Sequence, residues 1–212
     1  MNPAEKQVSY QIKNSYSTLN SYTEKTKNVW VVFHGIGYLS RYFLKYFKHL
    51  DPQENYIIAP QAQSKYYLND KYRHVGASWL TKENTEAETE NVLNYLEEVY
   101  KAEDLQNAPN LILFGYSQGV SVAARWVARN KTQCDHLILH SGGLPKELQP
   151  EDFKFLDQTK VTMIYGTKDE YLNSEKLETE QARARELFGD RLEIISFEGG
   201  HEVNVGLISQ FG

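Results

Sequence analysis

Six short runs of mostly apolar residues recur along the chain and constrain its fold more than any other feature. Several are continuous rather than alternating, as in "NVWVVF" at 28–33, which is typical of strands buried on both faces of a parallel sheet. The predicted strands are 28–35, 55–60, 110–117, 136–143, 160–167 and 191–200. Between them lie segments whose apolar residues recur every three or four positions, and the predicted helices are 39–50, 81–102, 119–130 and 173–189. This alternation predicts an α/β fold with a mostly parallel central sheet and helices on both faces.

The length of the chain sets the expected domain organisation. With 212 residues, 41% of them hydrophobic, the chain can bury one sizeable core, so we expect a single domain over residues 1–212. That length leaves little room for more than a minimal lid. The N-terminal segment 7–20 is expected to add an edge strand or a hairpin.

Charge and cysteine content narrow the range of partners and compartments. The net charge of −5 and the lack of a Lys/Arg run argue against nucleic acid as the main partner. Cys134 is the one cysteine, so no intramolecular disulfide can form, which favours a reducing environment. No apolar stretch is long enough for a signal peptide or a membrane span. We therefore expect a cytoplasmic protein, either a monomer or a homodimer.

Residues with catalytic chemistry follow the predicted strands. Ser117 lies in the turn after the apolar run 111–114, Asp169 follows 161–165, and His201 follows 192–197. The carboxyl ends of parallel strands meet at one edge of a sheet, so these three side chains are expected to lie together. Their chain order, Ser, Asp, His, is that of the α/β-hydrolase catalytic triad.

The turn "GYSQG" at 115–119 fits a nucleophile elbow, a sharp turn between strand and helix that exposes a serine. Small neighbours are needed there, which explains Gly115 and Gly119. A neighbouring imidazole must take the proton of Ser117, a role predicted for His201, with Asp169 orienting the imidazole. The backbone N–H groups of Gln118 and Ile36 are expected to form an oxyanion hole.

The sequence resembles the phospholipase/carboxylesterase branch of the α/β-hydrolases, which includes acyl-protein thioesterases. The resemblance covers about residues 28–208, and "LFGYSQGVSVA" at 113–123 is its most specific part. The other motifs that carry it are "FHGIG" (33–37), "IIAPQA" (57–62), "SWL" (78–80), "LILHSGGLP" (137–145), "IYGTKDEY" (164–171) and "GGHEV" (199–203). It implies an α/β-hydrolase fold and a serine hydrolase of carboxylic esters or thioesters that needs neither metal nor cofactor. It also places Ser117, Asp169 and His201 in the triad, and Ile36 and Gln118 in the oxyanion hole.

Two stretches depart from the family pattern. After the acid, such enzymes usually continue with small apolar residues and a proline, whereas Glu170-Tyr171-Leu172 follow here. Glu170 is therefore an alternative to Asp169 as the group that orients the histidine. The segment 61–79 is rich in tyrosine, and four of its aromatic residues are candidates either for an acyl pocket or for plain packing of the segment: Tyr66, Tyr67, Tyr72 and Trp79.

The other histidines show no metal-ligand spacing with acids or with Cys134, and His140 is predicted to be a buried histidine with satisfied hydrogen bonds. No phosphate-binding loop is present. A small-molecule ester or thioester is therefore the expected partner, with no cofactor and no metal. Two alternatives stay open: a non-catalytic ligand-binding protein on the same scaffold, and a hydrolase of amides or peptides.

Overall fold

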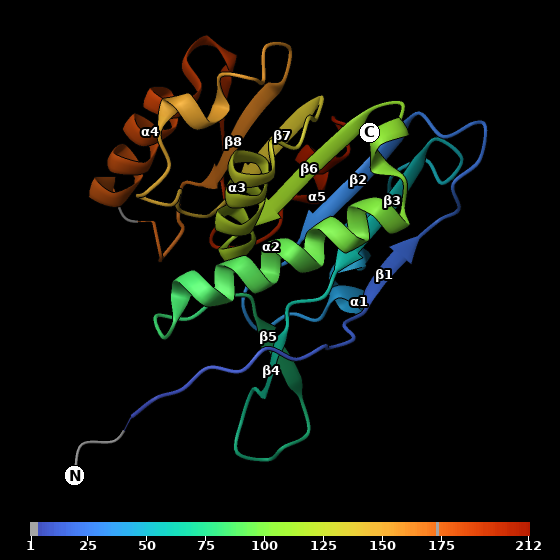
Figure 1. The fold of residues 1–212 in the computed structure, drawn as a ribbon. Coiled ribbons are helices and arrows are strands. Elements are labelled where there is room, and N and C mark those ends of the chain that lie inside the picture. The colour runs from blue at the N-terminus through green and yellow to red at the C-terminus, as the bar shows by residue number, and fades with distance from the viewer. Residues whose placement is uncertain (1–3, 173) are drawn as a thin grey trace.

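The computed structural model describes residues 4–172 and 174–212, and its centre is a seven-stranded sheet (Figure 1). The strand order is β1-β3-β2-β6-β7-β8-β9. All neighbouring strands are parallel except β1 and β3, which pair antiparallel at one edge. The strands are β1 (Tyr16–Leu19), β2 (Asn28–Phe33), β3 (Asn55–Pro60), β6 (Leu111–Tyr116), β7 (His136–His140), β8 (Lys160–Gly166) and β9 (Leu192–Phe197). The six predicted strands are thus confirmed, each ending at or before its predicted limit.

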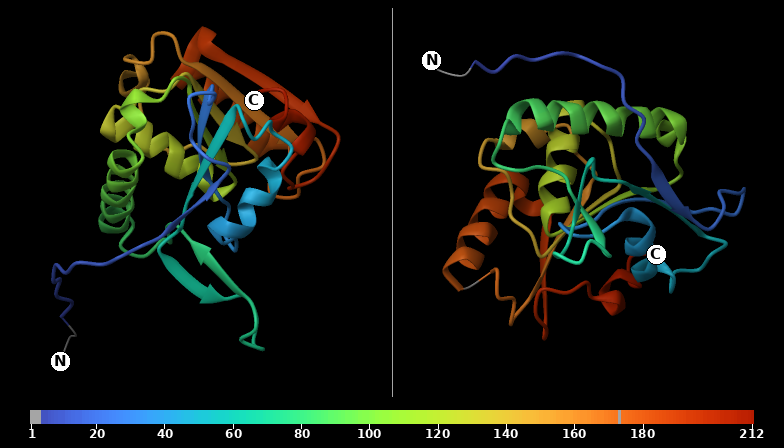
Figure 2. Two further views of the ribbon diagram at one scale, coloured as in Figure 1. Left: turned by 90° about the vertical axis from the view of Figure 1, so that its right-hand side faces the viewer. Right: turned by 90° about the horizontal axis from the view of Figure 1, so that it is seen from below.

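Helices cover both faces of this sheet, as predicted (Figures 1 and 2). The α-helices are α1 (Ser40–Phe43), α2 (Thr85–Ala102), α3 (Gln118–Asn130), α4 (Ser174–Phe188) and α5 (Val205–Ile208). Among the described residues, four short 3₁₀ helices accompany them: η1 (Leu44–Phe47), η2 (Leu105–Asn107), η3 (Pro150–Phe153) and η4 (Gly189–Arg191).

The two layers of helices bury two separate apolar clusters. Strand β2 shows why, because its successive side chains point to opposite faces of the sheet. Val31 packs in the cluster formed with α2, α3 and α4, whereas Trp30 packs in the cluster formed with α1, η1 and α5. A strand buried on both faces must be apolar at every position, which accounts for the continuous runs in the sequence.

Three segments differ in detail from the sequence-based expectations. The predicted helix 39–50 is divided into α1 and η1, and Phe43 and Phe47 both pack into the core from these two short elements. The expected edge strand within 7–20 is confined to β1. The segment 61–79 contains a β-hairpin, β4 (Ser64–Tyr67) and β5 (Val75–Ser78), which projects from the body of the molecule (Figure 2).

The sheet order brings together the ends of the strands that precede the candidate site residues. Strand β6 lies between β2 and β7, and β8 lies between β7 and β9. Because these strands are parallel, the segments that follow β2, β6, β8 and β9 all leave the same edge of the sheet. Within the described residues, no helix combines the length and apolar character that crossing a membrane requires.

Candidate active site

Ser117 occupies a strained turn between β6 and α3. Its backbone has φ 53° and ψ −118°, a conformation that non-glycine residues seldom adopt. The surrounding backbone holds it there, since the N–H of Ser117 donates to the carbonyl oxygen of His140 at 2.9 Å. The turn projects the serine from the sheet edge at the start of a 13-residue helix.

The two glycines of this turn are required by close backbone contacts. A Cβ on Gly115 would lie 2.6 Å from the carbonyl oxygen of Gly119. A Cβ on Gly119 would lie 2.1 Å from the carbonyl oxygen of Phe33 on β2. Neither backbone oxygen can move without breaking the contact between strand and helix, so the crowding expected from the sequence is present.

A chain of hydrogen bonds joins the three residues predicted to act together. Nε2 of His201 lies 2.9 Å from Oγ of Ser117. Nδ1 of His201 lies 2.8 Å from Oδ2 of Asp169, whose side chain is buried. With Nδ1 protonated and donating to the carboxylate, Nε2 is free to accept the serine proton.

Asp169 is the acid that faces the histidine. Its second oxygen, Oδ1, accepts the backbone N–H of Tyr171 at 2.9 Å, so both carboxylate oxygens have partners. Glu170, the alternative considered from the sequence, is exposed at the surface. The geometry therefore favours Asp169 as the partner of His201.

The loop after β2 runs directly beside Ser117. A Cβ on Gly35 would lie 3.2 Å from Cβ of Ser117. Strand β5 fixes this loop, because the N–H of Gly37 donates to the Ala77 carbonyl at 2.8 Å and the Ala77 N–H donates to the Tyr38 carbonyl at 3.1 Å.

The two backbone groups expected to bind an oxyanion are at this edge of the sheet. Across residues 4–172 and 174–212, no hydrogen bond engages the backbone N–H of Ile36 or of Gln118. The side chain of Gln118 makes hydrogen bonds to other residues. Its Oε1 accepts the backbone N–H of Trp79 at 2.8 Å, and its Nε2 donates to the Leu80 carbonyl at 2.7 Å. These contacts hold the first turn of α3 against the segment that follows β5.

Sequence comparison identifies the family of the chain. Residues 14–208 match the sequence model of the Phospholipase/Carboxylesterase family. The chain belongs to this family. No curated protein matches it. The resemblance stated from the motifs is therefore confirmed over nearly the whole chain.

Solved structures show the same fold at low sequence identity. A phospholipase/carboxylesterase from Dyadobacter fermentans is 20% identical, with a TM-score of 0.68 over 95% of this chain and 97% of its own. Acyl-protein thioesterase 2 from Zea mays is 14% identical, with a TM-score of 0.66 over 94% and 97%. A carboxylesterase from Bacillus cereus is 16% identical, with a TM-score of 0.65 over 93% and 91%. They confirm the predicted α/β-hydrolase fold.

In this member of the phospholipase/carboxylesterase family, the four aromatic candidates for a pocket differ in position. For Trp79 the structure favours the packing alternative, because its side chain has no exposed surface and its Nε1 donates to the His34 carbonyl in the core. Tyr66, Tyr67 and Tyr72 are exposed on the β4–β5 hairpin. The Tyr66 hydroxyl lies near Gly37, whereas the rings of Tyr67 and Tyr72 pack edge-to-face 5.1 Å apart near the hairpin end. Tyr66 is thus the hairpin tyrosine beside the candidate oxyanion loop.

Two tyrosines beside His201 were not predicted as site residues. The ring of Tyr116 lies 5.3 Å from the imidazole, and the ring of Tyr171 lies 4.7 Å from it, measured between ring centroids. Tyr116 belongs to the motif "GYSQG", where it directly precedes the serine, but the motif does not indicate that its ring contacts a histidine. Tyr171 was visible as a departure from the family pattern, although the sequence gives no sign of its contact with the histidine.

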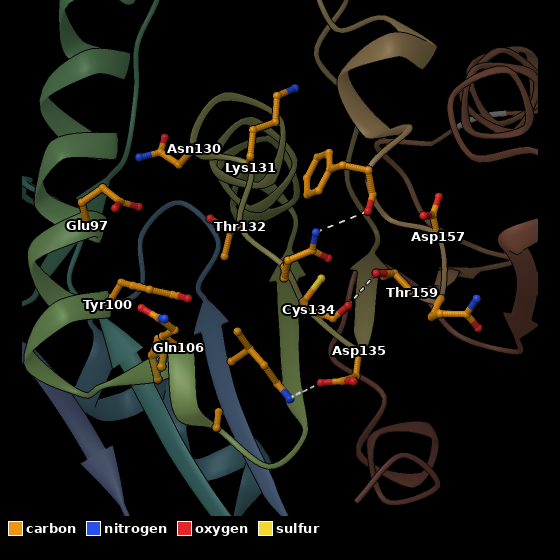
Figure 3. A pocket seen from close by; sticks show the side chains of 16 residues that line it. Glu97, Tyr100, Gln106, Asn130, Lys131, Thr132, Cys134, Asp135, Asp157 and Thr159 are labelled. Carbon is orange, nitrogen blue, oxygen red and sulfur yellow. Dashed lines mark hydrogen bonds between the residues drawn. The ribbon is translucent and has the colours of Figure 1, made fainter.

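A cavity of about 580 Å³ lies at the opposite edge of the sheet (Figure 3). Residues before β6, β7 and β8 line it, including Gln106, Asp135 and Thr159. None of the predicted site residues reaches it. No group of three or more metal-ligating side chains lies close enough together to hold an ion within the described part of the chain.

Two histidines are buried near the site in this family member. His140 donates from Nδ1 to Oγ of Ser141 and accepts the Asn204 N–H at Nε2, so it is a buried histidine with satisfied hydrogen bonds, as predicted. His34 accepts the Ala62 N–H at Nε2 and donates from Nδ1 to the Gly35 carbonyl. Burial lowers the pKa of His34 to about 4 and that of His140 to about 3, because a charge would be desolvated there.

These histidines predict a loss of stability in mild acid. Unfolded histidine has a pKa near 6.5, so below that pH the unfolded chain binds protons that the folded chain cannot bind. Each neutral buried histidine then lowers the free energy of unfolding by about 1.4 kcal/mol per pH unit, down to its folded pKa. His136 adds to this effect, since burial lowers its pKa to about 4.

Urea unfolding at pH 7.5, 6.5, 5.5 and 4.5 measures this loss. We expect little change between pH 7.5 and 6.5 and a falling free energy of unfolding below. The variant His136→Gln, whose amide can still bond with Thr162, is expected to weaken the pH dependence by about 1.4 kcal/mol per pH unit. Equal slopes for the variant and the wild type would contradict the assignment.

Proposed function

We propose that the protein is a serine hydrolase that cleaves carboxylic esters or thioesters through an acyl-enzyme intermediate. The observation that carries the proposal is the continuous hydrogen-bond chain from Ser117 through His201 to the buried Asp169, at a strained turn. Membership of the phospholipase/carboxylesterase family supports the same class of chemistry.

The first half of the reaction transfers the acyl group to the enzyme. Oγ of Ser117 attacks the carbonyl carbon while Nε2 of His201 takes the hydroxyl proton. The carbonyl oxygen becomes an oxyanion, which the N–H groups of Ile36 and Gln118 stabilise. The bond to the leaving group then breaks, and His201 gives its proton to the departing alkoxide or thiolate.

The second half releases the acid. Water takes the place of the leaving group and gives a proton to Nε2 of His201 as it attacks the acyl-serine. The tetrahedral intermediate collapses, the Ser117 oxygen leaves, and His201 returns the proton to it. Asp169 stays ionised throughout and stabilises the imidazolium that forms in both halves.

Hydrolysis and covalent labelling of the wild-type protein test this proposal. We expect it to hydrolyse p-nitrophenyl acetate, butyrate and octanoate, and the trend with chain length measures the acyl pocket. A fluorophosphonate is expected to add once per chain, with the adduct on the peptide that contains Ser117 in mass spectrometry. A protein that neither hydrolyses the esters nor takes up the label would contradict the proposal and favour a ligand-binding role.

A further inference from the structure

Tyr171 is an exposed aromatic side chain held against the candidate general base. Its ring meets the His201 imidazole edge-to-face, with 4.7 Å between centroids and an interplanar angle of 68°. The backbone on either side of this ring is anchored. The N–H of Tyr171 donates to Asp169, and its carbonyl accepts Nζ of Lys176 at 3.1 Å. Even so, 61% of the residue's surface is exposed.

The two tyrosine neighbours of His201 differ in access to solvent. The ring of Tyr116 is buried, and its hydroxyl donates to the His201 carbonyl at 2.9 Å, so this ring supports the histidine from within the protein. The imidazole itself is only 15% exposed. Of these two rings, Tyr171 alone offers surface to a substrate molecule.

The chemistry of the reaction decides which part of the substrate meets this ring. In the tetrahedral intermediate, the oxyanion points towards the N–H groups of Ile36 and Gln118. The leaving oxygen or sulfur must lie at Nε2 of His201, because it receives its proton there. A group attached to that atom and leading out to solvent passes His201, and Tyr171 is the exposed ring beside that histidine.

We infer that Tyr171 is a specificity-determining residue that contacts the leaving group and favours esters whose alcohol carries an uncharged apolar or aromatic group. The inference rests on the proposed function and adds to it the chemical class of the leaving group. Contact with such a group removes apolar ring surface from water on both partners, whereas a short alkyl alcohol covers little of the ring.

Two esters of one acid, ethyl butyrate and 2-phenylethyl butyrate, test the inference, because both release unactivated alcohols. The measured quantity is the ratio of kcat/KM for the phenylethyl ester to kcat/KM for the ethyl ester. We expect Tyr171→Ala to lower this ratio about tenfold, and Tyr171→Phe to keep it within twofold of the wild type. Tyr10→Ala is the matched control, because Tyr10 is another exposed tyrosine, at 77%.

The outcomes separate this inference from the proposed function. A ratio that is the same in Tyr171→Ala as in the wild type overturns the role of Tyr171, while hydrolysis of both esters leaves the proposed function standing. Equal losses for both esters would likewise overturn it, since they would show that Tyr171 only positions His201. If the wild type hydrolyses neither ester and takes up no fluorophosphonate, the proposed function fails and the inference fails with it.

Discussion

Replacing Ser117 with alanine is expected to lower kcat for p-nitrophenyl butyrate by at least about 10⁴-fold. The nucleophile is lost, whereas the oxyanion donors and the substrate site remain, so any residual rate reflects binding and electrostatics alone. The turn tolerates alanine because Ser117 already has a Cβ at φ 53°, so its strained backbone is unchanged. The measurement is steady-state hydrolysis with fluorophosphonate labelling of both proteins.

A control variant separates chemistry from packing. Ser121→Ala removes a serine hydroxyl one helical turn further along α3, where it donates to the Gln118 carbonyl at 2.9 Å. We expect this variant to hydrolyse the ester within about threefold of the wild type. If Ser117→Ala has a melting temperature close to that of the wild type yet still hydrolyses the ester at the wild-type rate, Ser117 is not the nucleophile.

Asp169→Asn is expected to lower kcat by about 10⁴-fold. The carboxylate accepts Nδ1–H of His201 on one oxygen and the Tyr171 N–H on the other. An amide of the same shape can present its NH₂ to the imidazole, which selects the tautomer whose Nε2 carries a proton and cannot accept the serine proton. It also removes the charge that stabilises the imidazolium. The measurement is kcat over pH 6 to 9.

Glu170→Gln is the matched control for this prediction. It makes the same chemical change one residue along the chain, at an exposed position. We expect kcat within about twofold of the wild type. A large loss in Glu170→Gln together with a small one in Asp169→Asn would show that the neighbouring acid orients His201 in solution.

The sequence was sufficient to predict the sheet and the close placement of Ser117, Asp169 and His201. Strands such as β6 are buried on both faces, so their sequences are apolar at nearly every position. These three candidate residues follow strand ends, and parallel strands bring such ends together whatever lies between them in the chain. The glycines at 115 and 119 add a local constraint that the structure explains by backbone contacts.

Features set by tertiary packing could not be predicted in the same way. The segment 39–50 has helical spacing, but it folds as a four-residue α-helix followed by a 3₁₀ helix, a change of helix type that the spacing of apolar residues does not report. Trp79 and Tyr66 are both aromatic residues of one segment, yet one is buried in the core and the other is exposed. The contact between Tyr171 and His201 joins residues that are distant in the chain, so no local pattern contains it.

The hydrogen bonds of His140 join the two segments that carry the candidate nucleophile and the candidate base. Its carbonyl holds the N–H of Ser117, and its ring holds the N–H of Asn204, which closely follows His201 in the chain. Three inter-strand spacings separate β6 from β9, and small errors in each would add up across the sheet. Because both hydrogen bonds end on His140 at the end of β7, the segments that carry Ser117 and His201 are tied to one residue and not only to their own strands.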